Sequence, residues 1–158
     1  MIIEELKKLY LSHVGCEPQA IEEMPASGSN RRYFRLLGNP TLIGVSGESL
    51  EENRAFLYMA EHFMQKGLNV PQVLAVSDDE MNYVQQDLGN VLLFDYIAEG
   101  RKTGVFSAPE KEMLRKTMRG LAKLQVLAAE QFDFNQCYPQ PEFNLRSILW
   151  DLNYFKYC

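Results

Sequence analysis

A run of small and polar residues, followed at once by arginine and aromatic residues, is the segment whose composition best suits chemistry on an anion. It reads Ser27-Gly28-Ser29-Asn30-Arg31-Arg32-Tyr33-Phe34-Arg35-Leu36. Small side chains let backbone N–H groups approach phosphate oxygens closely, and Arg31 or Arg32 supplies positive charge. The segment therefore predicts a phosphate-covering loop between two antiparallel strands. The alternative is an ordinary hairpin turn with solvated arginines.

The elements around this segment follow from hydrophobic spacing and from breaks rich in glycine and proline. An apolar stripe with helical spacing precedes it, and short strand-like runs lie on both sides. Turn-forming residues join these runs, which is typical of a β-meander. The spacing predicts a helix over residues 2–14 and strands over residues 21–25, 32–37 and 41–45.

The next part of the chain opens with a helix start signal. Ser49 and Glu52 fit a capping box, in which the glutamate side chain returns to the backbone of the cap residue. Two strand-like runs joined by a polar turn come after this helix, and only helical patterns follow them. The expected elements are strands over residues 73–76 and 82–86, a short helix over 91–97, a loop over 99–107, and helices over 109–131 and 145–158.

This order of elements predicts an α+β fold with a five-stranded antiparallel sheet and one helix inserted after the third strand. A doubly wound parallel sheet is excluded, because only one crossover helix interrupts the strands. The chain has 158 residues, of which 46% are hydrophobic and 11% aromatic, so a packed core is expected and disorder is not. The formal net charge is −5, which disfavours non-specific binding of nucleic acid.

Other function classes are disfavoured by what the sequence contains. Cys16, Cys137 and Cys158 are odd in number and far apart, and His13 and His62 are isolated, so neither a disulfide framework nor a metal site is expected. The first residues show no signal-peptide pattern, and no apolar run approaches the roughly 18 residues of a membrane span. The expectation is a cytoplasmic protein that binds neither membrane nor nucleic acid.

The last predicted helix, residues 145–158, is unusually rich in large apolar side chains for a terminal segment. So much apolar surface needs a partner surface to cover it, and no helix stop signal precedes Cys158. We therefore expect a truncated chain whose missing part covers this helix, and possible self-association through it in the piece at hand. The residues concerned are Leu145, Ile148, Leu149, Trp150, Leu152, Tyr154, Phe155 and Tyr157.

Four segments, in this order and spacing, resemble the N-terminal part of the aminoglycoside-phosphotransferase-like kinases, a family similar in fold to eukaryotic protein kinases. The chain is most similar to its bacterial N-acetylmuramate and N-acetylglucosamine kinase branch. The likeness covers about residues 20–130 and implies a protein-kinase-like N-lobe over residues 1–86, then a hinge and an incomplete helical C-lobe over residues 87–158. The four segments are Ser29–Leu36, Glu52–Phe56, Gly67–Leu74 and Gln86–Gly89.

The resemblance implies an ATP- and Mg²⁺-dependent phosphotransferase that acts on a hydroxyl of a sugar or aminoglycoside-like molecule. The catalytic and metal-binding aspartates of the family follow the long helix, and nothing after residue 131 matches them. The resemblance therefore gives this chain no catalytic or metal-binding residue, and the missing lobe would supply them, so this piece alone is expected to be inactive. The implied nucleotide-binding residues are Ser27, Gly28, Ser29, Asn30, Arg31, Arg32, Glu52, Gln86, Asp87 and Leu88.

The chain departs from the family pattern at the third strand, which has no lysine to bind the α- and β-phosphates. Arg31, Arg32 and Arg35 are the candidates to replace it. Glu52 has the capping box as its alternative role, and residues 86–88 have a strand-ending turn as theirs. Two other functions stay open for the chain: a non-catalytic kinase-like binding or regulatory module, and an interaction domain that docks through its last helix.

Overall fold

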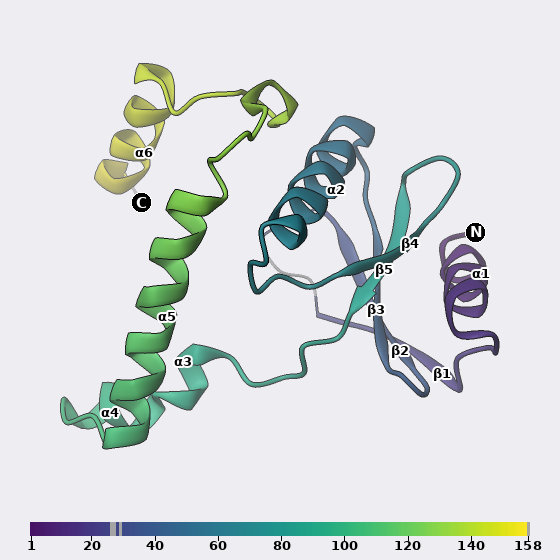
Figure 1. Ribbon diagram of the computed structural model, residues 1–158, viewed down its shortest axis with the longest axis horizontal. Coiled ribbons are helices and arrows are strands. Elements are labelled where there is room, and N and C mark those ends of the chain that lie inside the picture. Colours follow the sequence, from purple (N-terminus) through teal and green to yellow (C-terminus); the bar gives the residue numbers. More distant parts are fainter. Residues whose placement is uncertain (26–27, 29, 158) are drawn as a thin grey trace.

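A five-stranded antiparallel sheet forms the centre of the molecule in the computed structural model, which describes residues 1–25, 28 and 30–157 (Figure 1). The strand order is β1-β2-β3-β5-β4, so the middle strand β3 pairs with β2 on one side and β5 on the other. The α+β class and the five antiparallel strands are confirmed. The strands are β1 (Ala20–Glu23), β2 (Arg32–Leu37), β3 (Leu42–Ser46), β4 (Val73–Val76) and β5 (Asn82–Gln86).

Helix α1 (Ile2–Val14) covers one face of the sheet, and the main apolar core lies between them. The helix ends as predicted at Gly15, which has a φ of 87°. Its approach is close, because a Cβ at Gly44 would lie 3.0 Å from both methyl carbons of Leu6. The residues fully or nearly buried there are Leu6, Leu9, Tyr10, Phe34, Leu36, Leu42 and Val84.

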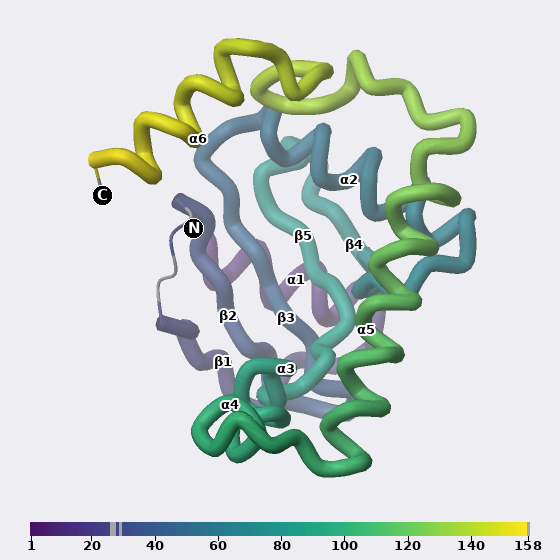
Figure 2. Tube along the Cα trace, turned by 90° about the vertical axis from the view of Figure 1, so that its left-hand side faces the viewer, coloured from purple at the N-terminus to yellow at the C-terminus, as the bar shows by residue number. Residues whose placement is uncertain are grey.

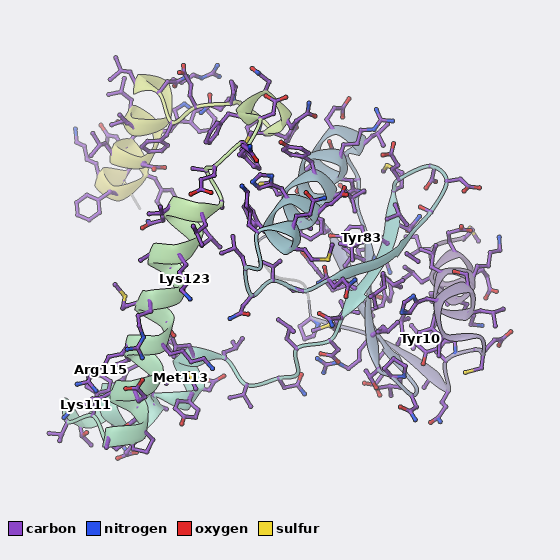
Figure 3. All side chains as sticks on the ribbon, viewed as in Figure 1. Tyr10, Tyr83, Lys111, Met113, Arg115 and Lys123 are labelled. Carbon is purple, nitrogen blue, oxygen red and sulfur yellow. The ribbon has the colours of Figure 1, made fainter. Side chains whose placement is uncertain are left out.

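Helix α2 (Leu50–Gln65) packs on the opposite face of the sheet. Its Phe56 ring stacks on Tyr83 of β5, with ring centroids 5.0 Å apart. Figure 3 shows Tyr83 on the side of the sheet near α2 and Tyr10 on the side near α1. Burial raises the pKa of the Tyr83 hydroxyl, so this side chain stays neutral in the folded protein.

Asn53 connects α2 to the turn between β4 and β5, and its side chain is completely buried. Its Nδ2 donates to the carbonyl oxygens of Glu80, at 2.9 Å, and Met81, at 3.1 Å. A Cβ at Gly47 would overlap the Asn53 amide, so the glycine leaves the space in which the amide lies. The helix and the hairpin are therefore joined by a buried polar contact in addition to apolar packing.

The remaining helices follow the sheet and lie on the same side of it as α2, while α1 lies behind the sheet in Figure 2. The predicted helix near residue 109 and the final helix are confirmed, and the Asn144 side chain caps the latter by accepting the backbone N–H groups of Arg146 and Ser147. The predicted loop over residues 99–107 is wrong, because a helix occupies much of it. These helices are α3 (Leu93–Tyr96), α4 (Ala98–Thr103), α5 (Ala108–Leu127), the 3-10 helix η1 (Phe134–Gln136) and α6 (Leu145–Tyr157).

A buried glutamate holds α4 against the start of α5. Glu110 accepts hydrogen bonds from the Ser107 hydroxyl, at 2.6 Å, and from the backbone N–H groups of Ser107 and Gly100, at 2.7 and 2.9 Å. The local preferences of the glycine and basic residues at 100–104 favour a loop. The hydrogen bonds of Glu110, and Gly104 in a left-handed conformation at the C-cap, stabilise a short helix there instead. The same hydrogen bonds, that of the Ser107 hydroxyl first, lower the pKa of the Glu110 carboxyl.

Glu110 is expected to make the protein less stable in acid. Because the folded pKa is lowered, its contribution to stability is complete above the pKa of the unfolded chain and is lost as pH falls through the folded pKa. Thermal unfolding of wild type and Glu110→Gln, followed by circular dichroism from neutral to acidic pH, measures this. The melting temperature of wild type should be higher at pH 7, and the difference should shrink in acid. A difference that stays constant with pH would contradict the assignment.

The helices after the sheet leave much apolar surface exposed. At the end of α5, the carbonyl of the cap residue Ala128 lies 2.9 Å from His62 Nε2 of α2. Of the apolar side chains of α5 at helical spacing, Leu114 and Leu124 are half-buried, whereas Met118 and Leu121 are exposed. All eight large apolar side chains of α6 are exposed, up to 87% for Phe155. Among the residues described, these side chains are therefore left uncovered, and the expectation that a missing part of the protein covers them stays a prediction.

Candidate functional site

The two-residue repeat of β2 separates its side chains between the two faces of the sheet. Phe34 and Leu36 point into the core under α1, while Tyr33 packs against the cluster under α2. Arg35 shares the face of Tyr33, and the same alternation carries back to Arg31 just before the strand. The face of the sheet opposite α1 is therefore the one where polar and charged side chains collect.

A cavity of about 220 Å³ lies on this face, at the end of the sheet where β5 leaves it. Met24, Tyr33 and Ile43 give it apolar walls, and Arg35 and the chain segment 85–89 supply its polar groups. The backbone N–H of Met24 donates to the Tyr33 carbonyl at 2.8 Å, which fixes this wall. The cavity thus combines an apolar slot with backbone and charged groups along one edge.

The ion pair between Arg35 and Asp87 fixes that edge. Arg35 Nε lies 2.8 Å from Asp87 Oδ2, and the two side chains keep only 17% and 11% of their surface exposed. Asp87 Oδ1 also accepts from the backbone N–H of Gly89 at 2.8 Å, so the carboxylate shapes the turn that follows β5. This pair spans 52 residues of sequence and positions the segment after β5 against the sheet.

In the backbone of residues 86–88, some N–H groups form hydrogen bonds within the sheet, and others are left for a ligand. The N–H of Gln86 donates to the Gln72 carbonyl at 3.0 Å and continues the pairing with the start of β4. The Leu88 side chain is 71% exposed, and among the described residues none accepts a hydrogen bond from the Leu88 N–H. A turn and a ligand-binding role are compatible for this segment, because the Leu88 N–H has no hydrogen-bond acceptor among the described residues.

A second ion pair lies further along the same face. Arg31 Nη2 lies 3.2 Å from Glu52 Oε1 and donates to the Glu52 carbonyl oxygen at 3.1 Å. The guanidinium carbon lies 5.0 Å from the centroid of the Phe56 ring. Arg31 is thereby held on the first turn of α2, with 11% of its side chain exposed, whereas 42% of the Glu52 side chain is exposed.

The expectation that Glu52 completes a capping box is wrong. Ser49 Oγ does accept the backbone N–H of Glu52, at 3.2 Å, but the Glu52 carboxylate turns to Arg31 and does not return to the cap. A carboxylate forms a stronger hydrogen bond with a charged guanidinium than with a neutral backbone N–H, and Arg31 lies close enough to form it. Glu52 is therefore available to position a cation.

The other residues expected at the site are not all brought together. Gly28 and Asn30 are exposed, and Ser27 and Ser29 lie outside the described residues. Arg32 lies on the α1 face, where both carboxylate oxygens of Glu23 accept its hydrogen bonds, at 2.8 and 3.0 Å. Its guanidinium carbon is 5.2 Å from the Phe34 ring centroid. The structure thus separates Arg32 from Arg31 by the thickness of the sheet.

Three cavity residues, Met24, Tyr33 and Ile43, were not among the predicted site residues, and Arg35 was proposed only as a possible phosphate ligand. In the sequence, Arg31, Tyr33 and Arg35 alternate with residues such as Phe34 and Leu36. This two-residue repeat places Arg31, Tyr33 and Arg35 on one face of the sheet. No local sequence pattern predicts the ion pair between Arg35 and Asp87. Among the described residues, no three His, Cys, Asp or Glu side chains are grouped as metal ligands.

Comparison with models of protein families and with curated protein sequences gives no match to this chain. In the part of the chain that the structure describes, none of the helices combines the length and apolar character that crossing a membrane requires.

Proposed function

We propose that this chain is the nucleotide-binding portion of an ATP- and Mg²⁺-dependent phosphotransferase, which acts on a hydroxyl of a sugar or aminoglycoside-like molecule. The observation that carries the proposal is the cavity on the sheet face opposite α1, bounded by Asp87 and Leu88 where the chain leaves β5. The five-stranded antiparallel sheet with a helix after its third strand supports it, as do the sequence segments that resemble the aminoglycoside-phosphotransferase-like kinases.

The chemistry of the cavity suits a nucleotide base. Apolar walls take the faces of a flat ring, and the Leu88 N–H suits a ring nitrogen at its edge. The volume of about 220 Å³ is below the roughly 300–1,000 Å³ of pockets that enclose a whole small ligand. The cavity would therefore hold the base, while the sugar and phosphates lie along the open sheet face.

The described residues do not by themselves bring together the carboxylates that a magnesium site needs. In this proposal the metal ligands, the catalytic aspartate and the contacts to the acceptor lie outside residues 1–158. That missing part would also cover the apolar surface of α5 and α6. The role left to this chain is to bind and orient the nucleotide, and residues 1–158 alone should show no phosphoryl transfer.

Isothermal titration of Mg·ATP into wild type and Gly28→Val tests the proposal. Gly28 is exposed, and a Cβ built there meets no atom within 4 Å, so the substitution should leave the fold intact. Wild type should bind saturably, and the variant should bind several-fold more weakly, because valine hinders approach of phosphates to the loop backbone. Thermal unfolding of both proteins is the control. Absence of binding at millimolar nucleotide would contradict the proposal.

A second candidate function is a non-catalytic binding or regulatory module of the same class. The observation in its favour is that the chain has no basic residue between Arg35 and Arg54, so β3 carries no cation for phosphates. The exposed helix α6 favours the third candidate, an interaction domain that docks through it. A longer sequence that lacks the two family aspartates would favour the non-catalytic module over the enzyme.

A further inference from the structure

Strand β4 forms one edge of the sheet and lacks a common protection of such edges. It ends the strand order on the side away from β1 (Figure 2). Charged side chains often protect an exposed edge from pairing, but Val73–Val76 is an apolar run without any. Just beyond it, the Ser77 N–H donates to the Asn82 carbonyl at 2.8 Å. Because backbone groups alternate in direction along an antiparallel pair, the N–H and C=O of Val76 point away from β5.

A cavity of about 290 Å³ lies beside this edge, between β4 and α2. A bulge in β4 shapes it: Leu74 and Ala75 both pack against the core under α1. Val73 and Val76, three residues apart, therefore both face α2. The helix contributes the other wall from one stripe of side chains. The cavity is lined by Leu57, Ala60, Glu61, Met64, Val73 and Val76.

We propose that this edge binds an extended segment of another protein, which adds to the sheet as a strand beside β4 and places an aliphatic side chain in the cavity between β4 and α2. Hydrogen bonds with the Val76 backbone supply affinity in this arrangement, and the cavity selects the side chain. The volume is just below the roughly 300–1,000 Å³ of pockets that enclose a whole small ligand, so it suits a side chain. The surface shares no lining residue with the cavity next to Asp87.

Glu61 indicates the charge of the partner segment. Its side chain is exposed at the cavity and accepts a hydrogen bond from Gln65 Nε2 at 3.1 Å, and among the described residues no basic side chain pairs with it. A lysine or arginine two positions from the aliphatic residue of the segment lies on the same face of the added strand. A second copy pairing through its own β4 brings no such charge, because residues 68–80 contain no basic residue. The charge therefore favours a different chain.

Selection from phage-displayed random decapeptides identifies a probe for this edge. The target is the wild-type chain, and Val76→Pro is used for counter-selection. Proline at this position removes an N–H that points away from β5, and edge strands tolerate proline at such positions. Thermal unfolding checks that the variant is folded. Enriched peptides should carry an aliphatic residue two positions from a lysine or arginine. If no peptide prefers wild type to Val76→Pro, the inference is overturned.

The most enriched peptide, labelled with fluorescein, then gives affinities by fluorescence anisotropy. Glu61→Lys should weaken binding about fivefold, as for loss of an exposed ion pair, and a peptide with glutamate in place of its basic residue should recover affinity for this variant. Glu51→Lys is the matched control, because it makes the same change of charge on an exposed residue of α2 that does not line the cavity. Equal losses in the two variants would contradict the proposed contact.

N-methylation of the peptide backbone tests strand addition without altering the protein. Alternate N–H groups of an added strand point to β4, so methylation at successive residues should alternate between a loss on the order of tenfold and little change. Equal effects at all positions would rule out an added strand. Sedimentation of wild type and Val76→Pro tests the other occupant: a dimer that is lost in the variant would assign this edge to a second copy and overturn the inference.

Discussion

Replacing Asp87 with asparagine should lower the free energy of unfolding by about 2 kcal/mol, because this part-buried pair lies between an exposed pair, at most about 1 kcal/mol, and a fully buried one, from which removing one partner costs roughly 3–5 kcal/mol. The substitution keeps the shape of the side chain and an acceptor for the Gly89 N–H. It leaves the guanidinium of Arg35, which is 17% exposed, without its counter-charge. Urea unfolding followed by far-ultraviolet circular dichroism measures the change, because the single tryptophan, Trp150, lies on α6 and does not report on the sheet.

An exposed ion pair on the other face of the same sheet gives the matched control. Arg32 and Glu23 are about half exposed, and pairs of this kind contribute at most about 1 kcal/mol. Arg32→Gln should therefore change the free energy of unfolding far less than Asp87→Asn. Equal effects of the two substitutions would show that burial adds nothing to the Arg35–Asp87 pair.

Replacing Asn53 with alanine should lower the free energy of unfolding by about 2 kcal/mol, because the part-buried Glu80 carbonyl is left without its donor. The Glu80 carbonyl loses the Asn53 amide, while the Met81 carbonyl keeps the backbone N–H of Gly47, at 2.9 Å. Gly47→Ala should have a similar effect, since its methyl group would displace the same amide. Both changes are measured by urea unfolding.

The double variant decides whether the two residues act through one contact. If Gly47→Ala acts by expelling the amide, it should cost much less in the Asn53→Ala background, so the two effects should not add. Arg54→Gln is a control on the same helix, because its ion pair with Glu80 is exposed and contributes less than about 1 kcal/mol. Additive effects of Gly47→Ala and Asn53→Ala would contradict the shared contact.

The sheet was predictable because each strand carries its own local signal. The alternation around Phe34 and Leu36 and the glycine-rich turns placed β2 and β3 within one residue of their observed bounds. Helix α4 was not predictable, because Gly100 and Gly104 read locally as a loop and the anchor that stabilises the helix comes from Glu110, ten residues from Gly100. Local preferences predict an element unless a distant contact overrides them.

The candidate site was predictable only in part, for a similar reason. The sequence indicated Arg31, Glu52 and residues 86–88, but it could not indicate that Glu52 prefers Arg31 to its own helix cap. The pairing of Arg35 with Asp87 joins β2 to the residue after β5, and these two strands are not adjacent, so the pairing follows from the strand order and not from any local pattern. The separation of Arg32 from Arg31 was available from the two-residue repeat.

The strand order also affects how the sheet can form as the chain is made. β3 can pair with β2 once both have been made, but its other edge has no partner until β5 has been made, and β5 follows a helix and another strand. All five residues of β3 are buried in the finished sheet. Until β5 emerges from the ribosome, the chain presents an unpaired edge of buried-type residues, the kind of surface that pairs with other chains and that chaperones shield. The latest strand to arrive is thus the one that makes β3 an interior strand.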